Sequence, residues 1–135
     1  LNFNEKPITY GEFKDTSFKL LHKGTDEYKY WYLKKSSDTS LRDAILRETG
    51  KNKRFNEKYI KDNMVCGTIV SKGKILRFDF PAKISNKDII TIQTFPQDYN
   101  FCGQNVQYIC GMSVPPIMMK KLAEQIYLQI FKNMR

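Results

Sequence analysis

Three cysteines and one histidine are the side chains of this sequence best suited to nucleophilic or metal chemistry. They are Cys66, Cys102, Cys110 and His22. A structural zinc site usually takes four such ligands in closely spaced pairs, so these scattered residues predict no metal site. No recognisably basic setting surrounds the cysteines, so we expect small buried or half-buried side chains and no catalytic nucleophile. His22 lies in a lysine-rich segment, which indicates an exposed position.

Basic side chains offer a second chemistry, the neutralisation of phosphates. Lys and Arg number 23 against 14 Asp and Glu, which gives a net charge of +9. This excess favours a polyanionic partner, nucleic acid first, and a solvated lysine-rich surface is the alternative. The most basic segment is residues 50–61, where lysines suit phosphates while an asparagine and an arginine suit base edges. These residues are Lys51, Asn52, Lys53, Arg54, Lys58 and Lys61.

The length and cysteine usage limit the fold and the location. A chain of 135 residues has room for one domain, whereas a doubly wound nucleotide-binding fold needs about 200 residues. The odd cysteine count without paired spacing indicates a reducing compartment, so we expect a cytoplasmic location.

No apolar run approaches about 20 residues, so no membrane span is expected. Leu1 begins a polar stretch, so we expect no signal peptide here.

Several segments of the chain read as strands. Residues 17–21 form a short run, and the aromatic residues of 28–33 alternate between two faces, which favours sheet packing over an exposed base-stacking platform. Residues 65–70 and 75–80 predict a hairpin, with Gly73 supplying the turn conformation between them. The stretch from residue 97 to Gly111 is polar and predicts a loop.

Two capping patterns predict short helices. Ser40 precedes Asp43 by three residues, and Ser85 precedes Asp88 by the same interval, which is the spacing of a capping box. Gly50 fits the C-terminal stop of the first helix.

A final amphipathic helix begins at Pro115 and Pro116. Its apolar face needs a covering surface, and either a missing larger domain or this chain's own strands could supply it. That face contains Met119, Leu122, Ala123, Ile126 and Ile130. The expected fold class is α+β: a small, mostly antiparallel β domain with short helices, followed by a C-terminal amphipathic helix.

Residues 83–99, KISNKDIITIQTFPQDY, resemble the ninth motif of cytosine-5 DNA methyltransferases. That motif reads roughly R-x-T-x-R-E-x-x-R-x-Q-x-F-P. Three residues match it outright: Gln93, Phe95 and Pro96. Four are chemically similar: Lys83, Ser85, Lys87 and Asp88. Thr91 replaces a family arginine.

Two shorter segments extend the resemblance to roughly residues 64–131. Residues 111–116, GMSVPP, are similar to the tenth motif, G-N-[SA]-V-P-P, with Met112 in place of asparagine. The dipeptide Thr68-Ile69 resembles the Thr-Leu or Thr-Ile pair of the family's target-recognition domain.

The resemblance implies part of an enzyme that transfers a methyl group from S-adenosylmethionine to C5 of cytosine in duplex DNA, as in restriction-modification. The family's Pro-Cys-Gln, Glu-Asn-Val and Gln-x-Arg-x-Arg motifs do not occur in these 135 residues. We therefore expect an inactive C-terminal part, with a target-recognition region over residues 1–82 and a motif segment over 83–135. Its expected partners are duplex DNA and a catalytic methyltransferase domain or subunit.

The resemblance also assigns candidate site residues. A wall of the cofactor pocket is expected from Gly111, Met112, Ser113 and Val114. The DNA-reading loops flank the dipeptide Thr68-Ile69, and Thr68 is expected to face the DNA backbone beside the flipped nucleotide. They comprise Lys51, Asn52, Lys53, Arg54 and Lys58 before the dipeptide, and Ser71, Lys72, Gly73 and Lys74 after it. Arg54 is the best candidate for a bidentate guanine contact. A structural role is implied for Lys87, Asp88, Gln93, Phe95 and Pro96.

Three alternatives stay open at this point. The chain is consistent with a free-standing basic nucleic-acid-binding module without methyltransferase activity. Met112 and Thr91 are consistent with a relic that has lost activity. The RNA-methylating branch of the same family shares these motifs, so RNA is an alternative substrate.

Overall fold

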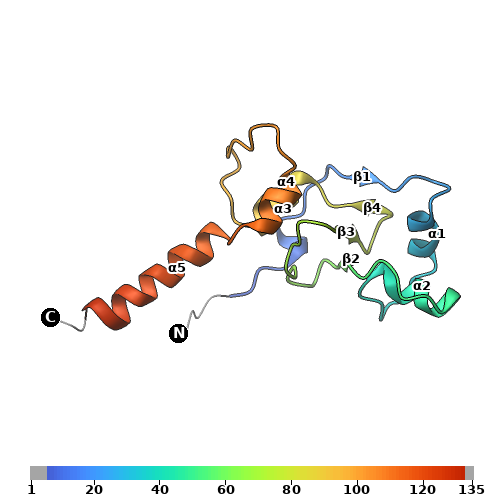
Figure 1. Ribbon diagram of the computed structural model, residues 1–135, viewed down its shortest axis with the longest axis horizontal. Coiled ribbons are helices and arrows are strands. Elements are labelled where there is room, and N and C mark those ends of the chain that lie inside the picture. The colour runs from blue at the N-terminus through green and yellow to red at the C-terminus, as the bar shows by residue number, and fades with distance from the viewer. Residues whose placement is uncertain (1–5, 133–135) are drawn as a thin grey trace.

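The computed structural model describes residues 6–132 (Figure 1). Short strands and helices are interleaved along the chain, which confirms the α+β class. In order, they are a 3₁₀ turn (Tyr10–Glu12), β1 (Lys19–Leu20), α1 (Asp26–Tyr32), α2 (Leu41–Thr49), β2 (Glu57–Ile60), β3 (Lys74–Arg77), β4 (Ala82–Lys83), α3 (Asn86–Ile92), α4 (Val106–Met112), α5 (Pro116–Ile126) and a π-helical turn (Tyr127–Phe131).

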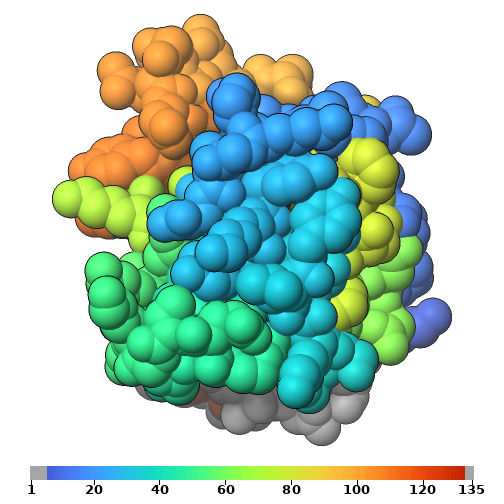
Figure 2. Space-filling model, turned by 90° about the vertical axis from the view of Figure 1, so that its right-hand side faces the viewer, coloured from blue at the N-terminus to red at the C-terminus, as the bar shows by residue number. Residues whose placement is uncertain are grey.

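The four strands form one mixed sheet in the order β1-β4-β3-β2. The β2–β3 pair is parallel, whereas β4 pairs antiparallel with both β1 and β3. Helices α1 and α2 lie at one end of the sheet, and α3 and α4 pack together at the other (Figure 1). Figure 2 looks onto the first end, where residues of α1 and α2, light blue to green, form much of the visible surface.

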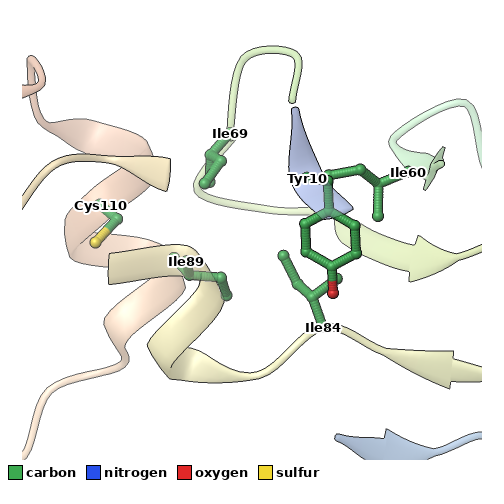
Figure 3. Close-up of a cluster of buried hydrophobic side chains, with 6 residues drawn as sticks. All are labelled: Tyr10, Ile60, Ile69, Ile84, Ile89 and Cys110. Carbon is green, nitrogen blue, oxygen red and sulfur yellow. The ribbon is translucent and has the colours of Figure 1, made fainter. Parts of the chain in front are cut away.

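Each face of the sheet has its own hydrophobic core. Neighbouring residues of a strand point to opposite faces, so Tyr59 and Ile60 of β2 enter different cores. The core on the α3–α4 side contains Tyr10, Ile60, Ile69, Ile84, Ile89 and Cys110 (Figure 3). The core on the α1–α2 side contains Leu21, Trp31, Leu41, Ile45, Tyr59 and Leu76.

The strand predicted over residues 28–33 is wrong, because residues 28–32 belong to helix α1 and Leu33 is its C-cap. The Thr25 hydroxyl caps this helix by accepting from the backbone N–H of Tyr28, and Asp26 and Glu27 occupy its first turn. On the helix, Tyr28 and Tyr32 are one turn apart, with ring centroids 4.8 Å apart. Six alternating residues are too few to separate a strand from a helix, and the cap decides the outcome.

The hairpin predicted over residues 65–80 is also wrong. Residues 65–70 form no strand, and β3 pairs with β2, which lies inside the segment expected to be a basic loop. Gly73 has no positive φ. A Cβ on Gly73 would instead come within 2.7 Å of the Asn56 carbonyl oxygen, so glycine is needed there for close packing of the chain.

The predicted loop from residue 97 to Gly111 is wrong in its second half, where α4 begins after Asn105. The Asn105 side chain accepts from the backbone N–H of Tyr108 at 2.9 Å, which caps this helix. Asn105 is a residue type that often precedes a helix, so it was the sequence signal that could have predicted the start of α4.

The helices predicted from the two capping boxes are confirmed. Asp43 accepts from the backbone N–H of Ser40 at the start of α2, and Gly50 ends this helix with a left-handed φ of 69°. Ser85 and Asp88 form the same reciprocal pair at the start of α3.

Helix α5 begins at Pro116, as predicted, and has no buried residue. It extends away from the rest of the chain (Figure 1), so the interpretation that its apolar face packs on this chain's own strands is wrong. Within residues 6–132, no helix has the length and apolar character needed to cross a membrane.

Candidate functional site

Three segments that are distant in the sequence meet around one cavity of about 350 Å³, which we call the junction cavity. Thr68 lines it from the loop that follows β2, and Gln93 lines it from the end of α3. Gly111 lines it from the last turn of α4, and Ser113 lines it from the link between α4 and α5. The structure thus brings together the segments of the Thr-Ile dipeptide, the ninth motif and the tenth motif.

The dipeptide Thr68-Ile69 divides its two side chains between the core and the surface. Ile69 is buried in the core of Figure 3, which fixes the position of the loop. Thr68 is exposed, so its hydroxyl group is accessible to a ligand.

Asp88 holds the ninth-motif helix against the N-terminal part of the chain. Asp88 is only 1% exposed. It accepts hydrogen bonds from the Tyr10 hydroxyl at 3.1 Å, the Asp15 backbone N–H at 2.8 Å and the Ser85 backbone N–H at 3.0 Å. Burial raises the pKa of Tyr10, and the Asp88 charge raises it further. Asp88 is therefore a buried structural acceptor, whereas the neighbouring Lys87 is exposed.

Gln93 and Phe95 belong to the C-terminal half of the ninth-motif segment, and Gln93 lines the junction cavity. Gln93 is 6% exposed, and its buried Oε1 has no hydrogen-bond partner within residues 6–132. Phe95 is half-buried and packs edge-on against Tyr99, with ring centroids 5.0 Å apart. Pro96 is exposed.

The tenth-motif segment links α4 to α5. Gly111 packs against the backbone of Val70 and Ser71, and a Cβ at position 111 would come within 2.5 Å of the Val70 carbonyl carbon. The Ser113 hydroxyl donates to the Ile109 carbonyl at 2.6 Å. Met112 is 66% exposed, and Val114 is also exposed. This segment presents two apolar side chains to its surroundings.

The predicted DNA-reading residues lie in two places. Lys51, Asn52 and Lys53 are exposed in the loop before β2, and Lys58 is exposed on β2 itself. After the dipeptide, Lys72 is exposed, while Ser71, Gly73 and Lys74 are half-buried.

Arg54 differs from its lysine neighbours because its guanidinium group is already engaged. Arg54 has a left-handed φ of 60°. Its Nη1 lies 3.0 Å from carboxylate oxygens of both Glu27 and Glu57. A guanine contact by Arg54 thus requires it to leave these two carboxylates.

The cysteines show no sign of an activated nucleophile. Cys110 is fully buried, and burial raises the pKa of its thiol. Burial likewise raises the pKa of Cys66 to about 11. Cys102 is exposed, and no disulfide joins the three. Within residues 6–132, no cluster of His, Cys, Asp and Glu side chains is suited to hold a metal ion.

The comparison with known families agrees with this assembly of motifs. The model of the C-5 cytosine-specific DNA methylase family matches residues 3–128. The chain therefore belongs to the C-5 cytosine-specific DNA methylase family. The match includes residues before position 64, in which the sequence showed no motif. No curated protein and no solved structure matches the chain.

Proposed function

We propose that this chain recognises duplex DNA for a DNA cytosine-5 methyltransferase and completes its cofactor pocket, while a separate domain or subunit supplies the catalytic cysteine. The observation that carries this proposal is the junction cavity, where Thr68, Gln93 and Ser113 meet. Residues that act on one flipped nucleotide and one cofactor must lie close together, and this arrangement supports that role. The unpaired cysteines support a cytoplasmic location.

DNA binding is supported by the exposed lysines on both sides of the Thr68-Ile69 loop. Four lysines of these segments are exposed to solvent: Lys51, Lys53, Lys58 and Lys72. Lysines that contact phosphates give affinity and salt dependence, whereas base contacts give sequence choice. Arg54 remains our proposed base contact, released from Glu27 and Glu57 when DNA binds.

The tenth-motif segment is suited to form one apolar wall of the cofactor site. Met112 and Val114 are both exposed, and the polar Ser113 lies between them in the sequence. S-adenosylmethionine, when bound, supplies the methyl group. In our proposal the Gly111–Val114 segment only positions it, and Met112 replaces the family asparagine with a side chain that lacks an amide.

The exposed apolar face of α5 and the π-helical turn supports a catalytic domain as the covering partner. Large apolar side chains are exposed on successive turns of this segment, and soluble proteins rarely leave such contiguous patches uncovered. They include Ile117, Met118, Met119, Ile126, Tyr127, Leu128, Ile130 and Phe131.

A reconstitution assay with tritiated S-adenosylmethionine tests the proposed function. The chain alone should bind duplex DNA without methylating it. Addition of a methyltransferase segment that contains the Pro-Cys-Gln motif should produce labelled DNA. Methylation by the chain alone would overturn the non-catalytic role, and DNA binding without reconstituted activity would favour the free-standing binding module. Preference for RNA over DNA in the same assay would change the proposed substrate.

A further inference from the structure

A second cavity, of about 390 Å³, lies between β1, β3, β4 and the start of α3. We call it the lysine cavity, because three lysines line it together with uncharged polar side chains. The polar lining residues include Ser17, Lys19, Lys74, Lys83, Asn86 and Gln107. Neither Lys19 nor Lys83 belongs to the DNA-reading loops expected from the sequence.

The sheet register forces the three lysines together. Lys19 and Lys83 are direct partners across the antiparallel β1–β4 pair, so their side chains lie on the same face. Lys83 is also the partner of Leu76 on β3, and Lys74 shares the face of Leu76 because it lies two residues earlier. Like charges placed directly opposite each other destabilise a strand pair, so the sheet alone gives no reason for this arrangement.

The carboxylates nearby do not balance the positive charge. Glu27 contacts Lys74 and lies 3.8 Å from the Lys83 ammonium group, and it also pairs with Arg54. Glu57 pairs with Arg54 and lies 3.6 Å from Lys74. Lys19 forms no ion pair within residues 6–132. Three cationic side chains thus share two carboxylates, and Lys19 adds a fourth positive charge to the cavity lining.

The pKa of Lys74 reflects its burial and the surrounding positive charge. Burial lowers the pKa of Lys74, and the positive charge of Lys83 lowers it further. An anion that enters the cavity would relieve the repulsion between these two ammonium groups. Side chains of Asn86 and Gln107 add amide groups to the lining.

We propose that the lysine cavity binds a phosphate group of the DNA backbone through Lys19, Lys74 and Lys83. A free phosphate shares this chemistry, but the cavity is continuous with the predicted DNA-reading loop. Lys74 belongs to both, and the Gln107 amide donates to the Gly73 carbonyl at 2.7 Å. The proposal deepens the proposed DNA recognition and rests on it. Such a contact adds affinity and salt dependence but no sequence choice.

The test compares salt dependence of duplex binding for the full chain and for Lys19→Gln/Lys83→Gln. Loss of one phosphate contact should reduce the slope of log affinity against log salt concentration by about 1. The affinity should fall by the same factor for unrelated duplexes. Lys19→Arg/Lys83→Arg keeps both charges and should retain the original slope. The matched control is Lys23→Gln/Lys120→Gln, which removes two exposed lysines outside both cavities.

Unchanged slope and affinity in the glutamine variant would overturn the proposal, as would an equal loss in the control. A loss in the arginine variant that matches the glutamine variant would show a structural effect and would also overturn it. Titration with inorganic phosphate forms a second arm. Binding of phosphate that depends on Lys19 and Lys83, without any effect on duplex binding, would assign the cavity to a free phosphate. If the unaltered chain binds no duplex, the proposed function fails, and absence of lysine-dependent phosphate binding then overturns the cavity's role as well.

Discussion

Gly111 in α4 packs against the backbone of Ser71, with no space for a side chain between them. A Cβ at position 111 would lie 2.7 Å from the Ser71 Cα and closer still to its nitrogen. This contact joins the tenth-motif segment to the chain that leaves Thr68-Ile69. The glycine therefore sets the distance between two segments that line the junction cavity.

Gly111→Ala should destabilise the fold despite the higher helix propensity of alanine. The obstructing atoms are backbone atoms, which cannot turn aside, so α4 must shift as a unit. We expect a loss of about 1–3 kcal/mol in the free energy of unfolding, measured by urea denaturation. Gly67→Ala is the matched control, because a Cβ at position 67 meets no atom within 4 Å. A loss for Gly111→Ala no larger than that for Gly67→Ala would contradict this account.

Asp88→Ala should be among the most destabilising single substitutions in the chain. It removes the acceptor of the Tyr10 hydroxyl and of two backbone N–H groups, at Asp15 and Ser85. Each buried donor left unpaired costs about 1–3 kcal/mol, and more when its partner was charged. Thermal unfolding measures the effect, and Asp98→Ala, at an exposed position, is the control. Equal melting temperatures for the two variants would show that Asp88 does not hold α3 to the N-terminal turn.

Asp79 should give the stability an acid-sensitive component. Hydrogen bonds from the Arg77 guanidinium group, at 3.0 and 2.6 Å, hold the pKa of Asp79 at about 2, against its usual 3.8. A carboxylate whose pKa is lower in the folded state stabilises the fold above the unfolded pKa. This contribution is lost as the pH falls from about 4 through 2. The stability difference between the unaltered chain and Asp79→Asn should therefore shrink over that interval in urea titrations, and a constant difference would contradict the assignment.

The helices that the sequence predicted are those with local start signals. Ser40 with Asp43 and Ser85 with Asp88 are capping boxes, and Pro116 begins α5. The start of each of these helices is therefore determined by residues within a few positions of one another. Helix α1 carried a comparable signal in Thr25, but the alternating aromatic residues favoured a strand.

Strand β2 was missed because its burial depends on contacts distant in the sequence. Tyr59 and Ile60 are adjacent, and each enters the core on a different face of the sheet. A strand buried on both faces shows no alternation of apolar and polar residues. Its parallel pairing with β3 also needs a crossover, which no local turn signal predicts.

Likewise, only part of the candidate site could be predicted from the sequence. The motifs containing Thr68, Gln93 and Gly111 could be found from residue types and spacing, but their meeting at one cavity depends on tertiary packing. The lysine cavity could not be predicted, because Lys19 and Lys83 become neighbours only through the β1–β4 register. The ion pair between Arg54 and Glu27 was hidden because these residues, 27 positions apart, meet only through tertiary packing.

Arg54 offers the sharpest test of sequence reading by this chain. If Arg54 leaves its carboxylates to contact a guanine, Arg54→Ala should reduce discrimination at one base pair by about 1–3 kcal/mol. Lys53→Ala, at the adjacent exposed lysine, should weaken binding equally for all duplexes. Glu57→Gln removes one charge that holds the guanidinium group and should strengthen binding to the preferred duplex. Competition binding with a set of single-base variants measures all three. A uniform loss for Arg54→Ala, with no gain for Glu57→Gln, would make Arg54 a positioning residue of the loop.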